Sequence, residues 1–347
     1  MQSPEQLTEQ TVFSQLRQLA SDPEIQQLVG DISNERFGDA VSYELGNIKE
    51  FSASMQTAFN FRIAGAERGN ATSLEHGEQF TDRIHKLAEK VGLAGDTVPT
   101  EPKADAVLVL GGAGKSPLDR TKYTKELLSN KTLDTNTVVL LGSSRPVDDA
   151  ERSRGGAYAK TAQTEYDLMM CAAAEVFDIS FNEQDEIVGY DDKVPTGFEG
   201  SWKIAHAVVD GINVFVLQSP MLTEQRFYPD TMTIKDGAHV EKLGNRRARA
   251  NTSDTYNMFA KVAELQEGSK VVAVTNAHFR PFQGADAVAE LSTYGIKTEV
   301  VGYDPSHFGN PPKKNEELLQ ETLSAVNSLN NAWQKASNTV IAIANQQ

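Results

Sequence analysis

A glycine-rich turn with a lysine follows an apolar run in the first third of the chain. The run Ala104–Leu110 has the pattern of a buried parallel strand, and Gly111 and Gly112 come directly after it. Glycine lets a ligand approach the backbone closely, so that N–H groups can face an anion. Lys115 adds a positive charge, and Pro117 suits the first turn of a helix. A strand, a glycine turn and a helix N-terminus in this order predict an anion or nucleotide site.

This turn does not fit the two best-known phosphate motifs. In a P-loop, the first glycine would fall at Val109, inside the strand. The dinucleotide fingerprint G-x-G-x-x-G does not occur here either. Two interpretations of the turn remain, one in which it binds a ligand and one in which it is only a tight turn.

Three more segments carry polar or cationic residues beside predicted strands and helices. They are Ser143, Ser144 and Arg145 after one strand, Arg249, Asn251 and Thr252 before a helix, and Asn276, His278 and Arg280 after another strand. In an open α/β sheet the ligand lies beyond the carboxyl ends of the strands. The recurrence of Arg and Lys there indicates an anionic small molecule, held through phosphate or carboxylate groups by guanidinium groups and helix N-termini.

Glu165 and His278 are the candidate catalytic residues, because carboxylates and imidazoles commonly transfer protons. Each candidate also has a purely structural interpretation. Glu165 would be a surface carboxylate on a helix, His278 a hydrogen-bonded loop residue, and Thr252 a helix N-cap. The two serines would only cap a turn, and the arginines around Arg249 would form a solvated charge run.

Composition excludes several classes of function. The 347 residues carry a formal net charge of −15, which argues against nucleic acid and anionic membranes as partners. The 6 His and 1 Cys show no metal-ligand spacing, so no metal is expected, and Cys171 suits a buried helix face. No apolar run approaches the roughly 18 residues of a membrane span, and the N-terminus lacks a signal-peptide pattern. We therefore expect a cytoplasmic protein.

The periodicity of apolar residues predicts a helical region over 1–100, with helices at Glu5–Ala20, Val41–Ala64 and Glu78–Val91 and no strand. From about 103, strands alternate with helices, which predicts an α/β fold with a mostly parallel sheet of about five strands. The expected strands are Ala104–Leu110, Thr137–Leu141, Asn213–Leu217, Lys270–Val274 and Thr298–Val301. The expected helices are at about 117–130, 158–176, 253–266, 279–294 and 315–345.

Asp210-Gly211 between Ile204–Val209 and Ile212–Leu217 predicts a hairpin, which would make one strand antiparallel. The pattern divides the chain into a helical region at 1–100, an α/β domain at 103–305 with an insert at about 178–250, and a C-terminal helix at 306–347. We expect that helix to pack against the N-terminal helices or a second subunit, which makes a homo-oligomer one expectation.

Five blocks of the chain agree in order and spacing with a known family. They are Val107–Gly112, Leu141–Ser144, Gln163–Met169, Arg249–Thr252 and Val274–His278, with Arg120 on the helix after the first block. By these blocks, the segment from Lys103 to Tyr303 resembles the DUF218 domain family (YdcF/SanA/ElyC-like proteins).

This resemblance implies a three-layer, Rossmann-like fold with a cleft lined by charged residues. It also makes S-adenosylmethionine one candidate cofactor, since one bacterial member is described as binding it. Our leading hypothesis is a protein that binds a nucleotide-like or phosphorylated small molecule and acts on it as an enzyme. The alternatives are a metabolite-binding or sensory protein without chemistry, and an interaction protein whose helices mediate assembly.

Overall fold

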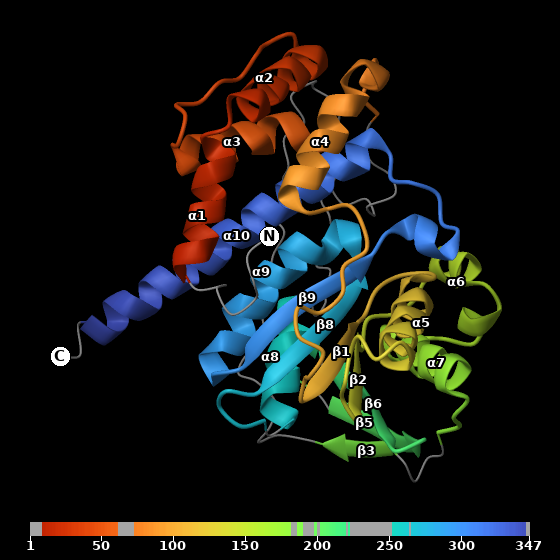
Figure 1. Ribbon diagram of the computed structural model, residues 1–347. Helices are drawn as coiled ribbons and strands as arrows, with labels where there is room; N and C mark the ends of the chain where they lie inside the picture. The colour runs from red at the N-terminus through yellow and green to blue at the C-terminus, as the bar shows by residue number, and fades with distance from the viewer. Residues whose placement is uncertain are drawn as a thin grey trace. The chain divides into compact units, whose positions relative to one another are not determined.

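The computed structural model describes residues 9–61, 73–181, 186–189, 198–199, 202–219, 221–222, 252–263 and 265–344 (Figure 1). The chain divides into two compact units. One unit consists of residues 1–100 together with 275–347, and the other consists of residues 101–274.

Among the described residues, seven strands form one mixed sheet in the order β3-β5-β6-β2-β1-β8-β9. The strands are β1 (Ala106–Leu110), β2 (Thr137–Ser143), β3 (Glu186–Gly189), β5 (Trp202–Val209), β6 (Ile212–Ser219), β8 (Lys270–Asn276) and β9 (Lys297–Tyr303). β6, β2, β1 and β8 run parallel to one another, whereas β5 runs antiparallel to both β6 and β3. The short strands β4 (Phe198–Glu199) and β7 (Met221–Leu222) pair separately. The prediction of an α/β fold with a mostly parallel sheet is confirmed.

Local sequence explains the central strand and the hairpin. All five residues of β1, Ala-Val-Leu-Val-Leu, are buried, as an apolar run in the middle of a parallel sheet requires. At the β5–β6 turn, Asp210 has φ 50° and Gly211 has φ 79°. Positive φ at both central residues is what a tight two-residue hairpin turn needs, so the predicted hairpin and its antiparallel strand are confirmed.

The helices of the unit 101–274 are α5 (Ser116–Ser129), α6 (Asp149–Gly155), α7 (Glu165–Phe177) and α8 (Thr252–Val262). α5 packs against β1 and against α7, while α7 and α8 both pack against β2 and β6. Figure 1 shows α5 and α7 on one side of these strands and α8 on the other, which gives three layers.

The helix predicted at 158–176 starts later than expected. α7 begins only at Glu165, because the Thr164 side chain accepts a hydrogen bond from the Asp167 backbone N–H, and the Asp167 side chain accepts one from the Thr164 N–H. This capping box ends the preceding loop and fixes the first turn of the helix. The result places Glu165 at a helix N-terminus instead of in a helix interior.

Among the described residues of the other unit, six α-helices surround an apolar core. They are α1 (Glu9–Ala20), α2 (Pro23–Phe37), α3 (Ile48–Phe59), α4 (Thr81–Val91), α9 (Arg280–Leu291) and α10 (Asn315–Ala344). α10 packs against α1, α3, α4 and α9, as expected for the C-terminal helix. Residues 9–61 and 73–100 contain no strand, as expected for this region. The helix predicted from Val41 begins only at Ile48, because the Asn47 side chain accepts a hydrogen bond from the Glu50 N–H and caps it.

The strand order places a topological switch point at β1. From β1 the chain proceeds through α5 to the neighbouring β2, and later returns to β8 on the other side of β1. In open α/β sheets the ligand binds in the crevice outside the carboxyl ends of the strands at such a point. The turn that starts at Gly111 leaves the sheet there.

Candidate functional site

A buried arginine fixes the start of the glycine turn after β1 by hydrogen bonds. Arg120, on α5, is only 1% exposed, and its Nη1 donates hydrogen bonds to the Leu110 carbonyl at 2.8 Å and to the Gly111 carbonyl. A Cβ added to Gly111 would lie 2.6 Å from the Leu141 carbonyl oxygen and 2.9 Å from Oε1 of Glu165. The position therefore requires glycine on steric grounds. Gly112 is less tightly enclosed, since its Cβ would meet Nη1 of Arg120 at 3.3 Å.

Glu165 places a largely buried carboxyl group, on a side chain that is 12% exposed, beside this turn. Ser143, the last residue of β2, donates from Oγ to Oε2 at 2.5 Å, and Nη2 of Arg145 lies 4.0 Å from Oε1. Burial raises the pKa of Glu165, and the negative charge of Glu151 raises it further. Arg145, the hydrogen bond from Ser143 and Arg120 act in the opposite direction, but the net shift is upward. The interpretation of Glu165 as a surface carboxylate is wrong, because the capped start of α7 turns it toward the strand ends.

Arg145 is already paired within the protein. Its Nη1 lies 2.8 Å from both carboxylate oxygens of Glu151, and the two side chains are only 10% and 7% exposed. Glu151 also accepts a hydrogen bond from the Asp148 N–H, as part of the capping box that starts α6. Sequence reasoning did not identify Glu151 as a site residue. The spacing Asp148-x-x-Glu151 was the available signal, although it predicts only a helix start.

The remaining predicted residues of this unit differ in their surroundings. Lys115 precedes α5, its side chain is 43% exposed, and its Nζ lies 3.8 Å from Oδ1 of Asp119. The Ser144 N–H donates to the Ser219 carbonyl at 3.1 Å, and within the described part of the chain its buried Oγ has no hydrogen-bond partner. Thr252 begins α8, and its carbonyl accepts a hydrogen bond from Oγ1 of Thr255. Arg249 and Asn251 lie outside the described residues.

Three predicted residues belong to the other unit, where each has partners of its own. Nδ2 of Asn276 donates to the Tyr303 hydroxyl at 2.8 Å. His278 is buried with its ring against that of Phe279. Arg280 donates to the Gly92 carbonyl at 2.6 Å and to Oγ1 of Thr97 at 2.7 Å, so its guanidinium ties down the segment that follows α4. Within the unit 101–274, the structure thus brings together Gly111, Gly112, Ser143, Arg145 and Glu165.

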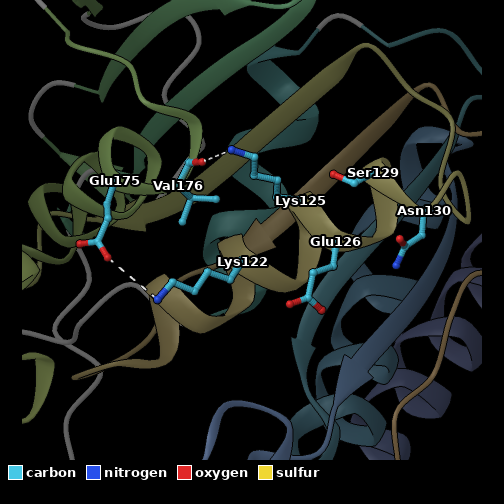
Figure 2. A pocket seen from close by; sticks show the side chains of 7 residues that line it. All are labelled: Lys122, Lys125, Glu126, Ser129, Asn130, Glu175 and Val176. Atoms are coloured by element: carbon cyan, nitrogen blue, oxygen red, sulfur yellow. Dashed lines mark hydrogen bonds and ion pairs between the residues drawn. The ribbon is translucent and has the colours of Figure 1, made fainter.

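A hollow of about 440 Å³ lies elsewhere on the unit 101–274, between α5 and α7 (Figure 2). Lys122 faces Glu175 there at 3.9 Å, and Lys125 donates to the Val176 carbonyl at 2.6 Å. These residues lie from the middle of α5 onward and in the last turn of α7, whereas Glu165 is the first residue of α7. The hollow is therefore separate from the glycine turn, and both of its lysines already have partners within the protein.

Cys171 is partly buried on α7, less than the buried position expected, and burial raises its pKa, which disfavours the thiolate. The described residues contain no group of three or more His, Cys, Asp or Glu side chains placed to hold a metal ion. Within the same ranges, no helix combines the length and the apolar character that crossing a membrane requires.

Comparison with known proteins gives distant relatives. No family model matches the chain, and no solved structure matches it significantly. The chain is 26% identical over 251 residues to the uncharacterized protein Rv3785 of Mycobacterium tuberculosis and to the uncharacterized protein Mb3814 of Mycobacterium bovis. The match covers 71% of this chain and 64% of each relative, so the chain spans less than two thirds of the length of these curated relatives.

Glu165→Gln should change how stability depends on pH. Because the pKa of Glu165 is raised in the folded protein, the folded chain binds this proton more tightly than the unfolded chain does. The carboxyl group therefore contributes stability below its unfolded pKa and loses that contribution as the pH rises through the folded pKa. Glutamine cannot ionise, so urea unfolding should show the variant gaining stability relative to wild type from pH 5 to pH 8.

Glu175→Gln serves as the control for this change, since it removes an exposed carboxylate from the same helix. It should show no comparable gain. A stability difference between Glu165→Gln and wild type that stays constant with pH, or shrinks as the pH rises, would contradict the assignment of a raised pKa.

Proposed function

We propose that the chain binds a small anionic metabolite beyond the carboxyl ends of β1 and β2, and that Glu165 transfers a proton in a reaction on it. One observation carries the proposal. The buried Glu165 carboxyl lies beside Gly111, at the strand end of the switch point, and accepts a hydrogen bond from Ser143.

The chemistry of this carboxyl group supports a role in proton transfer. A carboxyl group with a raised pKa holds its proton closer to neutral pH and can both donate and accept it. Groups perturbed by burial and by a specific charged neighbour are over-represented at functional sites. Arg120 and Arg145 place positive charge beside this carboxyl group, which favours a nearby anion, although both guanidinium groups also have partners within the protein.

The resemblance to the DUF218 domain family also supports the proposal, because its motif blocks contain Gly111, Gly112, Arg120, Ser143 and Glu165. Under this proposal the ligand is nucleotide-like or phosphorylated. S-adenosylmethionine remains the candidate that the resemblance adds.

A second candidate is a metabolite-binding protein without chemistry. It is favoured by the arrangement around Arg145, where one guanidinium faces the two carboxylates of Glu151 and Glu165. Structural ion-pair networks perturb a pKa in the same way as catalytic sites do. The two candidates differ in what happens to the ligand after it binds.

The test has two stages. Mass spectrometry of small molecules released from the natively purified protein identifies what it carries. Titration calorimetry with AMP and with S-adenosylmethionine then measures binding to wild type and to Glu165→Gln. We expect at least one of these ligands to bind wild type. If the protein is an enzyme, Glu165→Gln should reduce turnover of the carried ligand by about 100-fold or more, with affinity changed by less than about tenfold.

Glu175→Gln is the matched control, since it makes the same charge change on the same helix. Unchanged turnover in Glu165→Gln would contradict the catalytic role and leave the binding protein. The absence of any carried ligand, together with no binding of either compound, would contradict the site itself.

A further inference from the structure

Residues 147–163, called here the 147–163 loop, connect β2 to α7, and hydrogen bonds join the two ends of this segment. The Val147 N–H donates to the Gln163 carbonyl at 2.9 Å, and Arg152 donates to the carbonyls of Val147 at 2.6 Å and Ala162 at 3.1 Å. Its own apolar residues pack together with Leu168, the set being Val147, Tyr158, Ala159 and Ala162. Pinned ends and an internal core make this segment one compact piece, which includes the short helix α6.

This loop lies directly on the glycine turn. The Tyr158 hydroxyl donates to the Gly114 carbonyl, and burial raises the pKa of Tyr158, which keeps it protonated as a donor. A Cβ added to Gly114 would meet Cβ of Arg154 at 3.2 Å, and one added to Gly155 would meet the Gly114 carbonyl at 3.4 Å. The loop thus contacts the glycine turn at Gly114, three residues beyond Gly111.

The same loop supplies the carboxylate that pairs with the guanidinium of Arg145. Glu151 sits on α6 within the loop and contacts Nη1 of Arg145 with both oxygens. A carboxylate or phosphate group of a ligand would make the same kind of charge-assisted contact with this guanidinium. Within the described part of the chain, Glu165 on α7 also faces Arg145, and Arg120 on α5 is a second cation near Glu165.

We propose that Glu151 is an internal stand-in for the anionic group of the ligand and that the 147–163 loop is the lid of the site. An incoming phosphate or carboxylate replaces Glu151 on Arg145, and the loop moves off the glycine turn. This inference rests on the proposed function, since it concerns the same site. Under this proposal the site is closed as long as the ion pair between Glu151 and Arg145 is formed.

The energetics of such a lid depend on a small number of contacts. Apart from its pinned ends and its packing on Leu168, the loop contacts the site through the Tyr158–Gly114 hydrogen bond and the Glu151–Arg145 ion pair. A tethered carboxylate competes with a free anion at high effective concentration, so the closed state lowers the apparent affinity for the ligand. Removing the charge of Glu151 while keeping its shape should therefore tighten anion binding.

Glu151→Gln is the test variant, because its amide oxygen can still accept the capping hydrogen bond from the Asp148 N–H. Asp149→Asn is the matched control. It makes the same charge change on the same helix, at a side chain that is 99% exposed. Asp149 contacts Nη2 of Arg152, whereas the hydrogen bonds by which Arg152 closes the loop come from Nη1. Calorimetric titrations use inorganic phosphate and succinate as probes, so that the two sources of an anionic group are distinguished. We expect Glu151→Gln to bind at least one probe about tenfold or more tightly than wild type, and Asp149→Asn to stay within about twofold of wild type.

A second measurement does not depend on a ligand. Amide hydrogen exchange of the 147–163 loop should be about tenfold or more faster in Glu151→Gln than in Asp149→Asn, because the ion pair holds the lid closed. Equal probe affinity in Glu151→Gln and wild type would overturn the role of Glu151 and leave the proposed function standing. No binding of either probe by any variant would count against the site, whereas unchanged exchange of the loop would overturn the lid.

Discussion

Replacing Gly111 by alanine is expected to lower the free energy of unfolding by about 1–3 kcal/mol, the usual cost of forcing an extra methyl group into a packed site. The new Cβ would lie 2.6 Å from the Leu141 carbonyl, a backbone atom of β2 that cannot move without shifting the strand. It would also lie 2.9 Å from Oε1 of Glu165 and displace the carboxyl group. Urea unfolding measures the first effect. Loss of binding of the ligand carried by wild type measures the second.

Gly284→Ala is the control for this substitution. Gly284 lies inside α9, and an added Cβ would meet Val300 at 3.7 Å and 3.8 Å, which are ordinary contacts. Alanine is preferred over glycine in a helix interior by about 1 kcal/mol, so this variant should be more stable than wild type. The account of Gly111 would be contradicted if its alanine variant were as stable as wild type.

Replacing Arg145 by alanine should be more damaging still. The change leaves the buried carboxylates of Glu151 and Glu165 without their shared cation, and removing one partner of a buried ion pair typically costs about 3–5 kcal/mol. The pKa of Glu165, already raised by burial, should rise further, because Arg145 now lowers it. The loss of stability should consequently be smaller at pH 5 than at pH 8.

Two comparisons make the Arg145 result specific. Lys122→Ala removes a positive charge from an exposed pair with Glu175 and should cost less than about 1 kcal/mol. The double variant Arg145→Ala/Glu151→Gln should recover part of the stability lost in the single variant, because one unpaired carboxylate is gone. If Arg145→Ala cost no more than Lys122→Ala, the buried charge cluster would not be the organising feature of this site.

Much of the fold could be predicted because the determining signals are local. The uninterrupted apolar run of β1 and the Asp210-Gly211 turn each specify a strand or hairpin within a few residues. The late start of α7 was also locally encoded, since Thr164-x-x-Asp167 has the spacing of a capping box. The prediction from apolar periodicity alone began that helix at 158, although residues up to Thr164 form a loop that precedes it.

The candidate site was less accessible to sequence reasoning. Gly111 and Ser143 could be placed near one another because the carboxyl ends of neighbouring parallel strands share one edge of the sheet. Glu165 could not be placed in this way, because it was expected inside a helix over 158–176. The partner of Arg145 could not be predicted, because its contact with Glu151 depends on the conformation of the whole 147–163 loop. Burial of Glu165 likewise follows from packing against Gly111, and no property of the residue itself signals it.

The most direct test of the central claim is an amide NMR titration of the full chain with the ligand identified by mass spectrometry. The account predicts that the backbone signals of Gly111, Gly112, Ser143 and Arg145 shift together with one saturation curve, because these residues lie at adjoining strand ends. Shifts confined to other parts of the chain, such as the hollow around Lys122 and Lys125, with these four signals unmoved at saturation, would contradict it.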